Sequence, residues 1–291
     1  MRIIFVYTFF MAVLSISGQW VFPDKLHTEL SNSFNKNCGE MPYSVRNRPT
    51  FARMFENPWL VLLRHPEESL HFCHGTLINN QYILTTAVCG SAVVTNENAT
   101  TRHRPTEIVL GEHDLSTEPD CVTPWNCSLP VRKRSVNRVV IHPHFSNVTN
   151  ENDIALLFMN DTVQFDSTLR PICLPVIPIL EESDHYQQTI YNTIWSKDSI
   201  QRQMWMRYVP ATECREVIKS QHTLQDDQIC ARIYDKYAVD LNGSAGSALQ
   251  VDHDGHIFQF GILSVGTDAI HKMPQVYINI SKHINWINNS I

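Results

Sequence analysis

The chain has 291 residues and a hydrophobic fraction of 43%, which is enough for the core of one large domain or two small ones. Charged residues make up 18% of the sequence, and this balance argues against a disordered protein. The formal net charge of -6 at pH 7 gives no reason to expect nucleic acid or an anionic membrane as a partner.

The first 18 residues have the pattern of a secretory signal peptide. Arg2 supplies a positive charge, residues 3–16 are nearly all apolar, and Ser17 and Gly18 are small enough for signal peptidase. The apolar run is shorter than the roughly 20 residues that span a bilayer. We therefore expect a secreted, extracellular protein. Residues 19–45 are polar and are interpreted as a short pro-segment that contains Cys38, and a domain follows at residues 46–291.

Beyond Trp59, short β-type runs alternate with turns, which indicates a barrel or a sandwich. The first set of predicted strands covers residues 59–63, 71–78, 82–87, 107–110, 138–141 and 154–158. The second set covers residues 189–194, 204–209, 228–231, 248–251, 257–265 and 275–279. Near the C-terminus, Ser281 is expected to cap a helix in which Ile284 and Ile287 share one face. The basic residues 132–134 are interpreted as a solvated loop.

Eight cysteines in a secreted chain indicate a disulfide framework, although their number does not fix their pairing. No C-x-x-C motif occurs and the 14 histidines are scattered, so neither a metal site nor a cofactor is expected. Several sequons are expected to stay unused, and Cys127 in the middle of one argues against that one. The candidates for N-glycosylation are Asn98, Asn126, Asn147, Asn160, Asn242, Asn279 and Asn288.

Several motifs, far apart in the sequence, occur in an order that one enzyme family shares. The most informative are residues 84–89 (Leu-Thr-Thr-Ala-Val-Cys), 152–156 (Asn-Asp-Ile-Ala-Leu) and 243–249 (Gly-Ser-Ala-Gly-Ser-Ala-Leu). Over residues 38–291 the chain resembles the chymotrypsin-like serine proteases, and in particular the protease domain of arthropod clip-domain enzymes. The resemblance implies an all-β fold of two six-stranded antiparallel β-barrels with a C-terminal helix.

The resemblance also implies a pairing of the cysteines. Cys38–Cys173 would hold the pro-segment, and the other pairs would be Cys73–Cys89, Cys121–Cys127 and Cys214–Cys230. The family has one more disulfide beside the nucleophile and the substrate pocket. Its two cysteines are missing here, where Leu241 and the region of Asp268 stand in their places.

The resemblance places the catalytic triad at Val88, Asp153 and Ala245. The family has a histidine base where this chain has Val88, and a serine nucleophile where it has Ala245. An alkyl side chain can neither accept a proton nor attack a carbonyl, and the triad acts as a unit. We therefore expect no functional catalytic residue, with Asp153 as a buried carboxylate hydrogen-bonded to nearby backbone.

The activation switch and the substrate pocket also depart from the family. Residues 46–49 stand where cleavage would create an apolar N-terminus, and Ser244 replaces the aspartate that would pair with the new amine. Losing both partners avoids an unpaired buried charge. Val239 stands where trypsin-like members hold an aspartate, and Ser264 and Gly266 occupy the other pocket-equivalent positions. A glycan on Asn242 would block the mouth of the site.

The sequence therefore favours a secreted, non-catalytic serine protease homolog that acts by protein binding. The resemblance implies a regulator or cofactor of an extracellular protease cascade, of the immunity or melanisation type. Its partners would be cascade proteases, their zymogen substrates or inhibitors. One alternative is a weakly active endopeptidase in which Ser244, Ser247 or His74 act as displaced catalytic residues. Another is an extracellular decoy or structural glycoprotein, which the sequence does not separate from a regulator.

Overall fold

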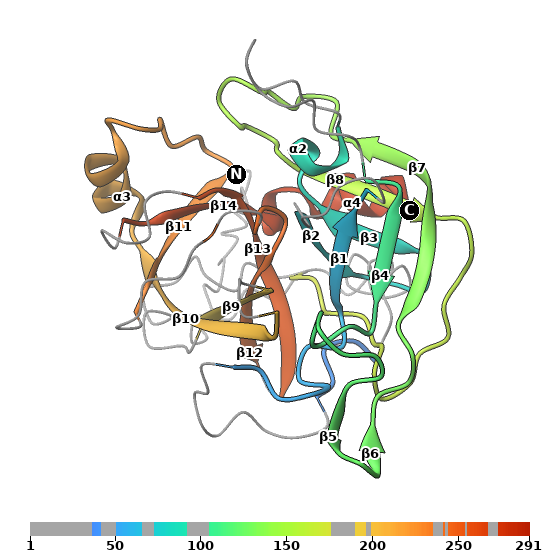
Figure 1. Ribbon diagram of the computed structural model, residues 1–291. Helices are drawn as coiled ribbons and strands as arrows, with labels where there is room; N and C mark the ends of the chain where they lie inside the picture. The colour runs from blue at the N-terminus through green and yellow to red at the C-terminus, as the bar shows by residue number, and fades with distance from the viewer. Residues whose placement is uncertain are drawn as a thin grey trace, which may run out of the picture.

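The computed structural model describes residues 37–41, 51–65, 73–91, 105–175, 190–195, 199–234, 241, 244–253, 255–266 and 273–291. Within these ranges the chain forms two closed barrels of six antiparallel strands, which lie side by side (Figure 1). The all-β fold with a C-terminal helix is confirmed. The predicted signal peptide and most of the predicted pro-segment lie outside the described residues, and the domain bounds stay a prediction.

The first barrel closes in the strand order β1-β2-β3-β8-β7-β4. Its strands are β1 (Leu60–Arg64), β2 (Cys73–Leu77), β3 (Tyr82–Thr85), β4 (Glu107–Leu110), β7 (Arg132–Ile141) and β8 (Ala155–Met159). The second barrel closes in the order β10-β11-β14-β13-β12-β9. Its strands are β9 (Ile190–Trp195), β10 (Gln201–Val209), β11 (Gln228–Ile233), β12 (Ala248–His253), β13 (His256–Val265) and β14 (Gln275–Asn279).

Strand β1 shows why some strands of this chain are apolar on both faces. Successive side chains of a strand point to opposite faces. Val61 and Leu63 face the large core of the molecule, whereas Leu60 and Leu62 pack in a second cluster that includes Trp195 of the other barrel. Both faces are therefore buried, and the sequence of the strand is a continuous apolar run and not an alternation of apolar and polar residues.

Buried side-chain hydrogen bonds join the two barrels. We call this set the seam. The Trp59 indole N–H donates to Gln250 Oε1 over 2.7 Å, and Thr76 Oγ1 donates to Gln259 Oε1 over 2.5 Å. Because an unpaired buried polar group is costly, these partners fix how one barrel sits on the other.

The structure contains four disulfides, and they are the pairs that the resemblance implies: Cys38–Cys173, Cys73–Cys89, Cys121–Cys127 and Cys214–Cys230. The segment around Cys38 is also held by backbone. Gly39 N–H donates to the Pro171 carbonyl over 2.8 Å, and Ile257 N–H donates to the Gly39 carbonyl over 2.9 Å. A chain cut after this segment would therefore keep it attached to the second barrel.

Two local predictions are wrong. Residues 132–134 do not form a loop, because they begin strand β7, which pairs with β4. Charged side chains are tolerated there because none of the three is buried, and Arg132 pairs with Asp166 while Lys133 lies 3.9 Å from Glu107. Ser281 does not cap the last helix, α4 (Ile284–Ser290). It lies in a preceding 3₁₀ turn, Ile280–Lys282, which delays the start of the helix.

Three elements have no counterpart among the predicted ones. They are the short helix α2 (Ala87–Gly90), the helix α3 (Ala211–Ile218) and the hairpin of β5 (Cys121–Thr123) and β6 (Asn126–Cys127). The hairpin projects from the first barrel, at the lower edge of Figure 1. All residues of its two strands are exposed, so they carry no apolar pattern from which a strand could be predicted.

Candidate functional site

Helix α2 positions Val88 at the edge of the first barrel. Strand β3 ends at Thr85, and the Thr86 hydroxyl then caps the helix by accepting a hydrogen bond from Cys89 N–H over 3.2 Å. The disulfide between Cys89 and Cys73 ties the helix to β2. Val88 is partly exposed on this helix, so an alkyl side chain occupies the position that the resemblance gives to the base.

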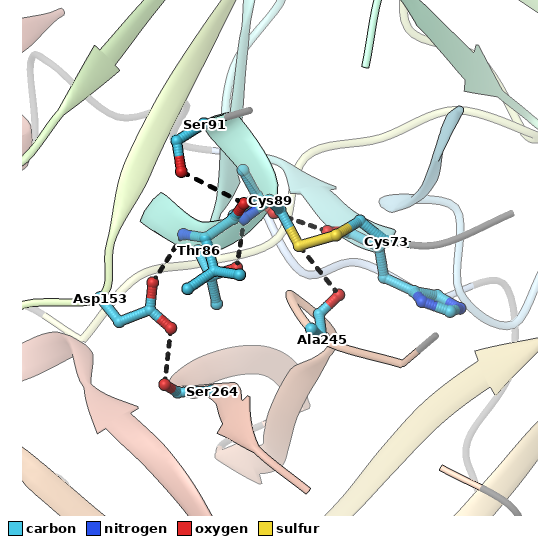
Figure 2. Close-up of a disulfide and its surroundings, with 10 residues drawn as sticks. Cys73, Thr86, Cys89, Ser91, Asp153, Ala245 and Ser264 are labelled. Atoms are coloured by element: carbon cyan, nitrogen blue, oxygen red, sulfur yellow. Dashed lines mark hydrogen bonds between the residues drawn. A yellow bond between two sulfur atoms is a disulfide. The ribbon is translucent and has the colours of Figure 1, made fainter. Parts of the chain in front are cut away.

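Asp153 is fully buried and joins the two barrels. Its Oδ1 accepts a hydrogen bond from Val88 N–H over 2.8 Å, and its Oδ2 accepts one from the Ser264 hydroxyl on β13 over 2.6 Å (Figure 2). The backbone contact agrees with the expectation from the sequence. The contact with Ser264 is not predictable from a local pattern, because the two residues are 111 positions apart and the resemblance places Ser264 in the pocket.

Burial raises the pKa of Asp153 from 3.8 to about 6. The hydrogen bonds from Ser264 and from the Val88 backbone oppose this rise, and the negative charge of Asp227 adds to it. In the family, a histidine next to this carboxylate becomes positively charged during catalysis. Val88 offers no such charge, so the carboxylate of Asp153 is stabilised only by neutral donors.

Ala245 lies in a tight turn that backbone hydrogen bonds hold against both barrels. His74 N–H donates to the Ala245 carbonyl over 2.8 Å, and Gly246 N–H donates to the Leu263 carbonyl over 2.9 Å. Gly246 has a φ of +85°, and a Cβ there would lie 2.0 Å from the His74 carbonyl oxygen, so the turn requires glycine. Figure 2 shows Ala245 below the Cys73–Cys89 disulfide, in the same small region as Asp153.

The three polar neighbours of Ala245 are buried. Ser244 is 1% exposed and its hydroxyl donates to the Leu241 carbonyl, while Ser247 is 0% exposed and its oxygen accepts from Asn192 Nδ2 over 3.0 Å. The ring of His74 is 1% exposed, stacks on Trp195 at 5.6 Å and accepts the Trp195 backbone N–H over 3.1 Å. Their hydrogen bonds thus serve the fold.

Most of the predicted substrate pocket lies outside the described residues. Val239, Asn242 and the region of Asp268 are all outside these ranges. The same is true of the predicted activation segment at residues 46–49. Gly266 is described and exposed just after the end of β13. Of the pocket-equivalent positions, Ser264 is thus the one that the structure connects to the triad positions, through its bond to Asp153.

The described residues contain neither a candidate metal site nor a candidate membrane-spanning helix. No three His, Cys, Asp or Glu side chains in these ranges are grouped so that they could hold a metal ion. No helix in the same part of the chain is long and apolar enough to cross a membrane.

The two barrels, with Asp153 held between α2 and β13, define the class of chymotrypsin-like serine protease domains. The chain belongs to the trypsin family, because the family model described as Trypsin matches residues 45–287.

Among curated proteins, the chain is similar to several insect proteases. It is 28% identical over 278 residues to Melanization protease 1 of Drosophila melanogaster, which covers 88% of this chain and 68% of the relative. It is 27% identical over 277 residues to the Inactive CLIP domain-containing serine protease A28 of Anopheles gambiae, covering 88% of this chain and 66% of that relative. The relatives therefore include a protein that is named inactive.

A solved structure supports the assignment to this fold and family. The Drosophila Grass clip serine protease of the Toll pathway matches with a TM-score of 0.71 and 25% identity, over 91% of this chain and 77% of that chain. The likeness spans both barrels, so the fold and the family agree.

Proposed function

We propose that the protein is a secreted, non-catalytic serine protease homolog that acts by binding other extracellular proteins. The observation that carries the proposal is the presence of Val88 and Ala245 beside the buried Asp153, in a site that is otherwise ordered by hydrogen bonds. Peptide hydrolysis by this family needs a nucleophile and a base that takes its proton. Neither alkyl side chain supplies one.

The burial of the neighbouring polar residues argues against a displaced catalytic mechanism. A nucleophile has to lie within hydrogen-bond reach of its base and within contact of a substrate carbonyl. Ser244 and Ser247 are 1% and 0% exposed, and the hydroxyl groups of both are engaged by the fold. The ring of His74 is held against Trp195. Using any of them would require the turn around Ala245 to open.

We infer the regulatory role from the relatives and the preserved scaffold. Melanization protease 1 and the inactive A28 protein are similar over 88% of this chain, so a cascade of extracellular proteases is the natural setting for a binding role. Four disulfides support an oxidising, extracellular location. The proposed partners are cascade proteases, their zymogen substrates or their inhibitors.

Hydrolysis assays test the non-catalytic part. The purified chain is assayed on peptide and ester substrates, before and after limited trypsin treatment followed by removal of the trypsin. We expect no turnover above buffer, with an active trypsin as the positive control. Turnover that scales with the concentration of the chain and persists after a second purification would contradict the proposal.

A dose experiment tests the regulatory part. The purified chain is added to cell-free extracellular fluid of the source animal, and the rate of arginyl amide hydrolysis by the endogenous proteases is followed after the cascade is triggered. A regulator changes that rate with dose, whereas the reduced and alkylated chain does not. An unchanged rate over the full range of doses would count against a regulatory role and leave the non-catalytic assignment standing.

A further inference from the structure

Five sequons lie in the described part of the chain, and the structure separates them by what their side chains do. They begin at Asn126, Asn147, Asn160, Asn279 and Asn288. The enzyme that attaches N-linked glycans acts on a chain that is not yet folded. The folded contacts therefore decide whether the modified chain can still reach this structure.

Asn147 lies at the exposed tip of the loop between β7 and β8. It is the first residue of a turn, and the next residue, Val148, is 87% exposed. Within the described residues the Asn147 side chain takes part in no hydrogen bond. A group attached to its amide nitrogen would displace no contact of the fold.

The rest of this loop is held firmly, so its tip is presented in a fixed direction. Gln228 Nε2 donates to the Asn150 carbonyl over 2.9 Å, and Asn152 N–H donates to Asp227 Oδ2 over 2.7 Å. Both partners belong to the second barrel or its approach, so the loop bridges the two barrels. At the tip, Thr149 N–H donates to the Ser146 hydroxyl over 3.3 Å.

Two of the other four asparagines, Asn160 and Asn279, use their own side chains in hydrogen bonds of the fold. Asn279 Oδ1 caps the 3₁₀ turn by accepting from Ser281 N–H, and Asn160 uses its oxygen on Ser135 N–H and its nitrogen on Asp161. Asn288 has a buried Oδ1. Asn126 is exposed, and what sets its sequon apart is the disulfide-bonded Cys127 at the middle position.

We propose that Asn147 carries an N-linked glycan in the secreted protein. In the reaction, Asn147 Nδ2 attacks the anomeric carbon of an oligosaccharide held on a lipid diphosphate. The new N–C bond forms as the C–O bond to the diphosphate breaks, and the Nδ2 proton passes to a base of the transferring enzyme. The proposal rests on the secretion that the proposed function includes, and on none of its catalytic claims.

A glycan at this position bears on where a partner can bind. The loop spans from the first barrel to Asp227 and Gln228, and it leads directly into Asp153. A branched, hydrophilic group at its tip would keep proteins away from this side of the molecule. The proposed binding surface is therefore expected on another face.

Site mapping tests the proposal. The full chain is expressed in insect cells, the medium and the cell lysate are collected separately, and glycans are released with peptide N-glycosidase A in ¹⁸O-labelled water. We expect the Asn147 peptide to appear as ¹⁸O-labelled aspartate, and the Asn279 peptide to remain unlabelled. Asn147→Gln should abolish the label and the corresponding gel shift, and Thr149→Ser should preserve both because it keeps the sequon.

Unlabelled Asn147 in both fractions would overturn the proposal, whether or not the chain reaches the medium. Labelled Asn147 found only in the lysate would support the site and contradict secretion. The hydrolysis assay described above, run on the same preparation, reports on catalysis independently. Failure of the glycan proposal is thus distinguishable from failure of the proposed function.

Discussion

The turn around Ala245 and the seam between the barrels are both held by buried hydrogen bonds, but different parts of the chain supply them. In the seam the bonds come from side chains, as between Trp59 and Gln250. At Ala245 and Gly246 themselves they come from the backbone: His74 N–H to the Ala245 carbonyl, and Gly246 N–H to the Leu263 carbonyl. The shape of the turn therefore does not depend on the side chain at position 245.

This difference would let the scaffold of a protease persist without catalytic side chains, as the proposed function requires. A serine or an alanine at position 245 can be accommodated by the same backbone bonds, so loss of the nucleophile leaves the fold in place. A comparable loss in the seam would leave a buried polar group without a partner, which costs about 1–3 kcal/mol.

The first prediction concerns activity, where an intact site would give the largest change and this site is expected to give none. The double variant Val88→His/Ala245→Ser completes the triad with Asp153, yet we expect it to cleave an arginyl amide at near-background rate, with or without limited trypsin treatment. Ser244 offers no carboxylate to pair with a new N-terminal amine, so the oxyanion hole should stay unformed, and loss of one oxyanion donor alone costs about a hundred- to a thousand-fold. Turnover within about tenfold of an ordinary trypsin would show that the remainder of the site is competent.

The largest expected effect on stability is at Gly246. Gly246→Ala places a Cβ 2.0 Å from the His74 carbonyl at a φ of +85°. We expect a loss of about 3 kcal/mol or more in the free energy of unfolding, measured by chemical denaturation. The matched control is Gly255→Ala, where φ is +81° and nothing lies within 4 Å, so only the backbone strain of about 1 kcal/mol should appear. Equal losses at the two positions would show that the turn around Ala245 can relax.

The carboxylate that links the regions should make stability depend on pH. Burial raises the pKa of Asp153 to about 6, above its ordinary value of 3.8. The folded chain therefore binds this proton more tightly than the unfolded chain, and the resulting stabilisation is complete below about pH 4 and lost as the pH rises to about 6. The expected loss is about 3 kcal/mol.

Asp153→Asn should remove this dependence, because an amide stays neutral while its oxygen accepts from Val88 N–H and its nitrogen donates to Ser264. Relative to the wild type, the variant should gain stability on going from about pH 4 to about pH 7.5. Asp166→Asn is the opposite control. Burial alone would raise the pKa of Asp166, but the hydrogen bonds from Arg132 and Thr168 outweigh it and hold that pKa below its ordinary value. Its carboxylate stabilises the fold at neutral pH and not in acid. A gain in acid for Asp153→Asn would mean that a cation pairs with the carboxylate.

The smallest expected effect compares the two regions directly. Gln250→Leu leaves the indole N–H of Trp59 without its partner, and we expect it to lower the free energy of unfolding by about 1–3 kcal/mol. Ala245→Ser adds one hydroxyl to a partly exposed position and should change stability by less than about 0.5 kcal/mol. Similar losses from both substitutions would remove the distinction between a turn held by backbone and a seam held by side chains.

The strands were predictable from the sequence where local pattern decides, and the contacts of the site were not. The twelve barrel strands coincide with apolar or alternating runs, and the family motifs order them into two barrels. The start of β7 was not predicted, because charged residues such as Arg132 and Lys133 are typical of solvated loops. Backbone pairing with β4 does not require apolar side chains. The bond between Asp153 and Ser264 joins residues 111 positions apart, so no local pattern could reveal it.

The central claim is that this chain lacks a reactive serine, and labelling with a fluorophosphonate probe tests it most directly. The purified wild-type chain is incubated with the probe and its intact mass is measured, with active trypsin as the positive control. Because Ala245 has no hydroxyl and the side chains of Ser244 and Ser247 are buried, we expect the mass to remain unchanged. Stoichiometric labelling that peptide mapping assigns to Ser244 or Ser247 would contradict the account.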